Sequence, residues 1–258
     1  MTSHSLTVTV ADRHSPDLHI PQTVTTVTVR DCDGQTVTVR DCDGQTVTVR
    51  DCDDCDGQTV TVRDETVTVR DCDDCDGQTV TVTDCDGQTV TVRDCDETVT
   101  VRDCDGQTVT FRDCDGQTVT VRDCDDTVSV RDCDGQTVTV RDCDCQTVMV
   151  RDCDETVTVR ACDGQTVTVR DCDGQTDETV TVRDFDGQTV TVRDCDGQRL
   201  TVSDCDGQTV TVRDCDGQTV TTVTVRDCDG QTVTVRDYCD GQTVTVRDCD
   251  GQTVTVRL

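Results

Sequence analysis

The chain has 258 residues and a formal net charge of -31, with no Trp, one Tyr and two Phe. The large side chains that dominate ordinary hydrophobic cores are therefore scarce, and the excess negative charge disfavours binding to nucleic acid or to an anionic membrane. Val and Thr, the main repeated residues, favour extended backbone. The composition leaves two alternatives, a stacked β-solenoid or an intrinsically disordered acidic repeat polymer.

The first 21 residues differ from the rest of the chain. They hold all three histidines, His4, His14 and His19, and both prolines, and we expect residues 1–21 to form an unstructured leader. Residues 1–10 lack the basic and apolar regions of a signal peptide, and no apolar run approaches the roughly 20 residues that span a bilayer. The default location is therefore the cytoplasm, where thiols stay reduced.

Residues 22–258 repeat the decapeptide Asp-Cys-Asp-Gly-Gln-Thr-Val-Thr-Val-Arg, and Asp31–Arg40 is the first clean copy. Thr-Val-Thr-Val-Arg alternates as a strand with one buried face, and Gly34 suits a turn because glycine readily adopts positive φ. Cys32 is then a third inward residue beside the two valines. We therefore predict an all-β fold, a single-stack parallel β-solenoid with one decapeptide per rung and rungs about 4.8 Å apart.

Departures from the repeat bear on its origin. Thr25-Thr26 and Thr221-Thr222 mark insertions of three residues in the strand, and an odd insertion turns later side chains to the other face unless a bulge absorbs it. Cys145 replaces the turn glycine and Met149 a threonine, each through a single base change. Such changes are typical of a drifting 30-base DNA repeat. The leading hypothesis is a non-enzymatic tandem-repeat product with no dedicated biochemical activity.

Catalysis is not expected from this sequence. The repeats contain no His to act as a base for Cys or Ser. Their carboxylates are many but equivalent and solvated, so nothing would separate two pKa values into an acid and a base.

A Thr-x-Thr ladder runs through most copies, as in Thr36-Val37-Thr38 and Thr46-Val47-Thr48. The ladder resembles that of the ice-binding insect antifreeze β-solenoids, in which flat arrays of paired threonines order water on an ice plane. The resemblance covers only the Thr-Val-Thr triplets. It implies an alternative function, binding to an ice surface through Thr36, Thr38, Thr46 and Thr48.

Paired aspartates suggest a second alternative function, low-affinity binding of calcium or other cations. Closely spaced carboxylates supply the hard oxygen ligands that Ca²⁺ prefers, and the candidates are Asp31, Asp33, Asp41 and Asp43. The later ligand positions of an EF-hand loop are lacking. Calcium is therefore the one cofactor that the sequence suggests, through loose bridging of neighbouring rungs.

Two Cys-x2-Cys pairs, Cys52/Cys55 and Cys72/Cys75, have the spacing of a structural zinc site. The same spacing follows from duplication of an Asp-Cys-Asp step, so we do not expect a dedicated zinc site there. The expected partners are instead cations, an ice surface, or further copies of the chain that associate through exposed strand edges or solenoid ends.

Overall fold

The computed structural model shows an all-β chain whose neighbouring strands in each sheet are parallel, which confirms the predicted parallel β-solenoid. The chain forms two compact units, Met1–Asp125 and Asp126–Leu258. The structure describes residues 7–11, 26–30, 36–39, 46–50, 59–62, 66–70, 79–83, 89–94, 98–104, 108–114, 118–133, 137–153, 156–172, 179–195, 199–205, 209–213, 222–227, 232–236, 243–248 and 253–257.

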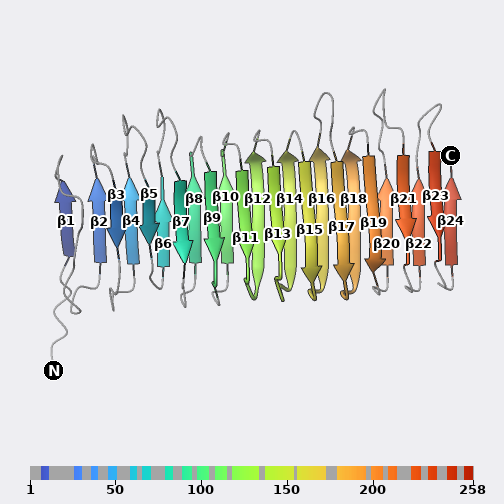
Figure 1. Ribbon diagram of the computed structural model, residues 1–258, viewed down its shortest axis with the longest axis horizontal. Coiled ribbons are helices and arrows are strands. Elements are labelled where there is room, and N and C mark those ends of the chain that lie inside the picture. Colours follow the sequence, from blue (N-terminus) through green and yellow to red (C-terminus); the bar gives the residue numbers. More distant parts are fainter. Residues whose placement is uncertain are drawn as a thin grey trace. The chain divides into compact units, whose positions relative to one another are not determined.

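The strands of the first unit lie in two sheets. One sheet has the order β1 (Thr7–Ala11), β2 (Thr26–Arg30), β4 (Thr46–Arg50), β6 (Thr66–Val69), β8 (Thr89–Arg93) and β10 (Thr108–Arg112). The other has the order β3 (Thr36–Val39), β5 (Thr59–Val62), β7 (Thr79–Thr83), β9 (Thr98–Arg102) and β11 (Thr118–Arg122). From β2 onward successive strands alternate between the sheets and point in opposite directions (Figure 1).

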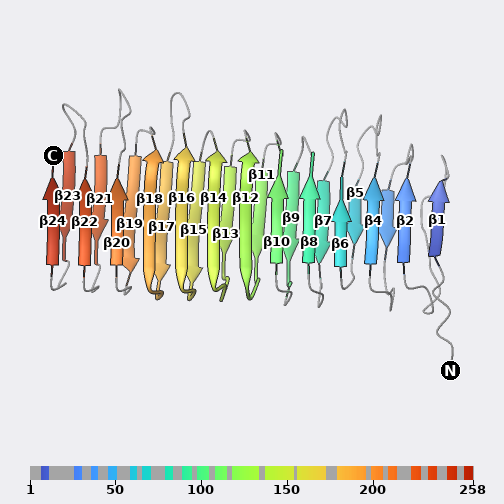
Figure 2. The same cartoon turned by 180° about the vertical axis from the view of Figure 1, so that it is seen from behind.

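The second unit has the same arrangement. One sheet has the order β12 (Thr127–Cys133), β14 (Thr147–Cys153), β16 (Thr166–Cys172), β18 (Thr189–Cys195), β20 (Thr209–Arg213), β22 (Thr232–Arg236) and β24 (Thr253–Arg257). The other has the order β13 (Thr137–Arg141), β15 (Thr156–Cys162), β17 (Thr179–Phe185), β19 (Arg199–Cys205), β21 (Thr222–Arg226) and β23 (Thr243–Arg247). Seen from behind, the sheet that contains β12, β14 and β16 comes to the front (Figure 2).

One coil contains two decapeptides, about 20 residues, and the predicted rung of one decapeptide is wrong. Val47 pairs in register with Val67, and Val148 with Val167, on the next strands of their sheets. The physical reason is burial. A Thr-Val-Thr-Val strand has one apolar face, and that face is covered when the next copy folds back as a strand of the opposite sheet, so that both sets of valines share one core.

At the described corners one residue lies in the left-handed region, with φ of 48–54°. This residue is Asp at all of them except Ala161, and it follows Arg everywhere except at Asp204, which follows Ser203. Asp adopts that conformation more readily than most residues. The corner shifts the alternation of buried and exposed side chains by one residue. Val140 is buried, so strict alternation would bury Asp142 and expose Cys143, but Asp142 is exposed and Cys143 is buried. Inward-facing cysteine was predicted correctly.

Two described glycines lie where neighbouring coils approach closely. The predicted turn residue Gly34 lies outside the described residues, and the left-handed residue at the described corners is Asp or Ala161. At Gly164 an added Cβ would overlap the carbonyl oxygen of Cys145, and at Gly187 it would overlap the carbonyl oxygen of Gly164. Glycine is required at these two positions because neighbouring coils approach closely there.

The structure corrects two expectations, one about the leader and one about the inserted residues. Residues 7–11 of the expected unstructured leader form β1, which pairs in register with β2, because Thr7–Val10 repeats the Thr-Val-Thr-Val pattern. The inserted Thr25-Thr26 and Thr221-Thr222 do not turn later side chains over. The strands simply start at Thr26 and Thr222, in register with Thr46 and Arg199, so the extra residues precede the strand.

Candidate functional site

The outward threonines of each sheet form two parallel rows. In the first unit Thr46 and Thr48 are half-exposed, and Thr48 pairs in register with Thr68 on the next strand. Strands lie about 4.8 Å apart and alternate residues about 6.6 Å apart, so the hydroxyls form a regular two-dimensional grid. The described rows of this sheet contain Thr46, Thr48, Thr66, Thr68, Thr89, Thr91, Thr108 and Thr110.

The four predicted ice-binding threonines do not share one face. Thr36 and Thr38 lie on β3 and Thr46 and Thr48 on β4, which belong to different sheets. The backbone places Thr36 in register with Thr59, whereas the side chains of β3 lie outside the described ones. A row therefore combines every second copy of the repeat. The described rows on the sheet of β3 contain Thr79, Thr81, Thr98, Thr100, Thr118 and Thr120.

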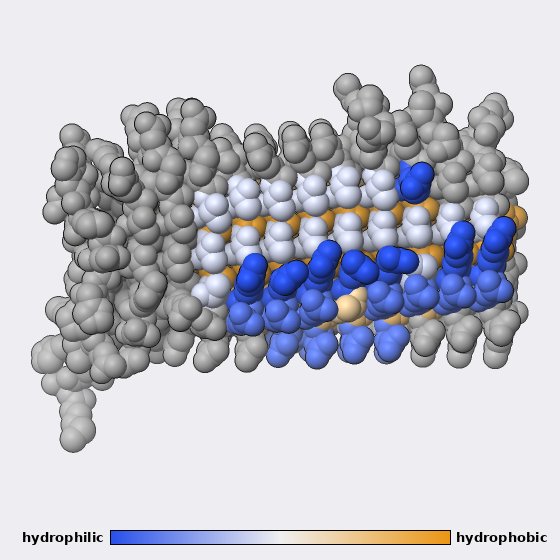
Figure 3. Space-filling view, in the orientation of Figure 1, coloured by the Kyte–Doolittle hydropathy of each residue, from blue (hydrophilic) through white to orange (hydrophobic). Residues whose placement is uncertain are grey.

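The second unit carries the same rows with three interruptions. Ser129 and Met149 replace threonines on β12 and β14, and Arg199 replaces the first threonine of β19. Met149 is half-exposed among the threonines, as the sequence predicts. Figure 3 shows such a face, where pale threonine rows alternate with orange apolar rows and blue charged residues follow along one edge. The surface is therefore regular over several consecutive strands.

Arginine and aspartate lie beside these rows rather than within them. Arg141, at the end of β13, pairs in register with Arg160, two residues before the end of β15, so these arginines stack along one side of the sheet. The aspartates of the following corners are mostly exposed, as at Asp103, Asp113 and Asp123. The charged rows lie beside the threonine grid, and the Nε atoms of several arginines, including Arg141, are buried against their neighbours. Apart from Met149 and Arg199, the grid presents hydroxyl and methyl groups.

The buried cysteines form the corners of the core. Ten of them are thiols within the described part of the chain. Each thiol with a described hydrogen bond donates to the carbonyl two residues earlier: Cys143 Sγ lies 2.9 Å from Arg141 O, and Cys153 Sγ lies 3.3 Å from Arg151 O. A hydrogen bond with Cys133, followed by burial, raises the pKa of Cys153. Cys153 is therefore a protonated packing group, unlike the thiolate of a nucleophilic cysteine.

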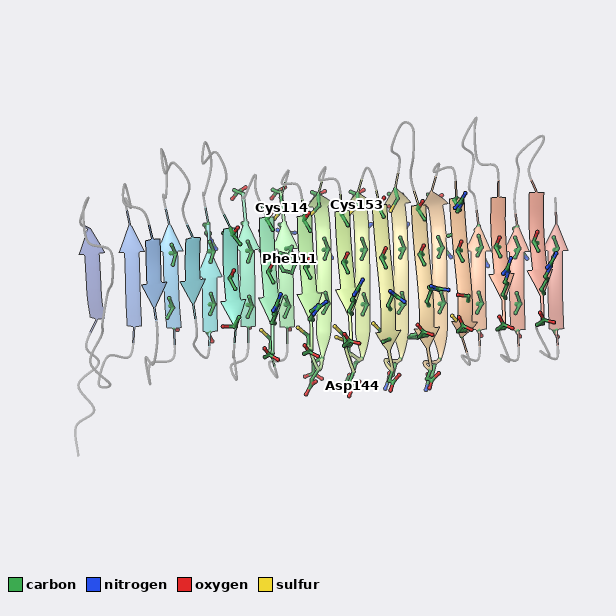
Figure 4. The ribbon with its side chains drawn as sticks, viewed as in Figure 1. Phe111, Cys114, Asp144 and Cys153 are labelled. Carbon is green, nitrogen blue, oxygen red and sulfur yellow. The ribbon has the colours of Figure 1, made fainter. Side chains whose placement is uncertain are left out.

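The predicted metal-ligating residues fall outside the described residues. These are Asp31, Asp33, Asp41 and Asp43 for calcium, and Cys52, Cys55, Cys72 and Cys75 for zinc. In the part of the chain that the structure describes, no group of three or more His, Cys, Asp or Glu side chains could hold a metal ion. In a described copy, Asp142 and Asp144 flank Cys143 and are both exposed. Figure 4 shows Asp144 at the turn beyond the strand.

Three residues that depart from the repeat are fully buried. Phe111 takes a valine position on β10, Phe185 takes a corner cysteine position on β17, and Cys145 takes a glycine position. The repeat pattern alone predicts that Phe111 and Phe185 are buried, because each occupies an inward position of the repeat.

No family model, curated protein or solved structure matches this chain. Among the described residues, no helix is long and apolar enough to cross a membrane.

Proposed function

We propose that this protein is a non-enzymatic repeat protein that binds to the surface of ice through its threonine rows. The observation that supports the proposal is the in-register Thr-x-Thr grid, which repeats on the outer face of both sheets. Each threonine of this grid whose side chain the structure describes is half-exposed, except Thr253, which is exposed.

The chemistry of the grid suits an ordered water layer. A threonine hydroxyl both donates and accepts a hydrogen bond. The methyl group forms no hydrogen bond, so water can bind only at the hydroxyl positions. Threonine is also stiff about χ1 because it is β-branched. A rigid array therefore fixes water positions with little loss of side-chain freedom on binding, which a flexible polar surface would not.

The strand geometry separates this surface from the charged groups. On β8 the outward side chains are Thr89, Thr91 and Arg93, so charge is confined to one edge. The apolar positions Val90 and Val92 point inward and are buried. The outer face thus presents a regular hydroxyl pattern without a charge in its centre, except where Arg199 replaces threonine.

The test is thermal hysteresis and inhibition of ice recrystallisation by the purified, reduced chain in the presence of a chelator. A variant with Thr91→Lys, Thr100→Lys, Thr158→Lys and Thr168→Lys places one charge in each described face of the two units. The expected result is activity in the wild type and its loss in this variant.

A matched control adds the same charge at exposed turn positions, through Gln146→Lys, Asp163→Asn, Gln165→Lys and Gln188→Lys. It should keep the activity of the wild type. Far-UV circular dichroism verifies that all three proteins hold the same β-content. A folded wild type without thermal hysteresis would contradict the proposal. It would support the hypothesis of a repeat product with no dedicated activity.

A further inference from the structure

Buried cysteines on neighbouring coils are stacked in register. Cys133 pairs with Cys153 on adjacent parallel strands, and both are completely buried or nearly so. On the opposite sheet Cys143 N donates to Ala161 O, which places Cys143 beside Cys162. Figure 4 shows the Cys153 side chain at the end of its strand, where the chain turns.

The spacing of these thiols suits one bridging atom better than a disulfide. In-register residues of adjacent strands lie about 4.8 Å apart, and each thiol makes the same hydrogen bond to the carbonyl two residues earlier. The sulfurs therefore repeat at about the strand spacing. Two metal–thiolate bonds of about 2.3 Å laid end to end span about 4.6 Å, whereas a disulfide requires about 2.05 Å.

The hydrogen bond of the Cys162 thiol is not the only one that its acceptor receives. Arg160 O accepts a hydrogen bond from Cys162 Sγ at 3.3 Å and a second from Asp142 N at 3.2 Å. Loss of the Cys162 thiol proton would leave the Arg160 carbonyl with its backbone donor, so that carbonyl keeps a hydrogen bond. The metal would thus replace a redundant hydrogen bond.

We propose that the stacked pairs Cys133/Cys153 and Cys143/Cys162 each bind one soft monovalent cation, of the Cu(I) and Ag(I) class, between two thiolates. The two S–H bonds break, two metal–sulfur bonds form, and two protons pass to the solvent buffer. No atom changes its oxidation state. Soft thiolate ligands select such ions over hard cations, and a pair of sulfurs supplies only two of the four ligands that a tetrahedral zinc site takes.

The experiment titrates the full, reduced chain with Ag(I) in a chloride-free buffer, and native mass spectrometry counts the bound ions. Cys143→Ser/Cys162→Ser should bind one ion fewer than the wild type and should release two fewer protons at saturation. The control Val140→Ala/Val159→Ala removes buried side-chain volume on the same two strands and keeps both thiols. It should bind as many ions as the wild type.

X-ray absorption of the silver-loaded wild type gives an independent result that does not depend on the folding of a variant. The expected first shell is two sulfur atoms. Three or more sulfurs per ion, or an equal ion count in the double cysteine variant, would overturn the proposal. Thermal hysteresis measured on the metal-free chain is independent of this outcome.

Discussion

Gly164 lies directly against the carbonyl oxygen of Cys145 on the neighbouring coil, so closely that a Cβ at residue 164 would overlap that oxygen. The adjacent backbone is held in the same register, because Gln165 N donates to Gln146 O at 3.1 Å. Glycine therefore sets the closest approach of two coils at this turn.

Gly164→Ala is expected to destabilise the chain by about 3 kcal/mol or more, because the obstacle is a backbone carbonyl that cannot rotate away and overpacking is costly. The midpoint of thermal unfolding measures the effect. Asp163→Ala changes an exposed neighbour in the same turn and should alter stability by no more than about 0.5 kcal/mol. Equal midpoints for the two variants would contradict the close approach.

Ala161→Gly is expected to stabilise the chain. Ala161 has φ of 49° at a corner where thirteen other copies have Asp, and the left-handed conformation costs an L-residue about 1–2 kcal/mol. Glycine removes this cost but adds freedom to the unfolded chain, which leaves a net gain of about 0.5–1 kcal/mol. Urea unfolding compares it with Ala161→Val, which should be less stable than wild type because β-branched residues tolerate positive φ poorly.

Stability should decrease as the pH rises above about 9. In the folded chain, hydrogen bonds with neighbouring thiols and burial raise the pKa values of Cys153 and Cys162 above the ordinary 9.0. The unfolded chain then loses these protons while the folded chain keeps them, so the free energy of unfolding falls. The contribution is complete below that pH, and its loss reaches about 1.4 kcal/mol per pH unit for each thiol.

Thermal melts between about pH 7 and pH 10.5 in a phosphine reductant test this dependence. Cys153→Ala/Cys162→Ala removes two of the titrating thiols, and its midpoint should fall less steeply than that of the wild type. A parallel decline in the two proteins would assign the pH dependence to other groups.

Much of the fold follows from local pattern. The alternation of Thr and Val indicated each strand and its buried face, and Val47 and Val49 are buried as that pattern predicts. The inward position of cysteine also followed from the repeat. The candidate surface was predicted as a Thr-x-Thr ladder, and Thr46 and Thr48 are outward and half-exposed.

The sequence by itself determined the strands, their apolar face and the outward threonines, because side-chain alternation is a property of a single strand. Only the tertiary structure decided which copies are neighbours. Thr36 and Thr46 lie in different sheets, because a strand's valines are buried when the next copy folds back against them. The stacking of Cys133 on Cys153 is decided in the same way, since in-register contacts between coils arise only after about 20 residues of chain have closed one turn.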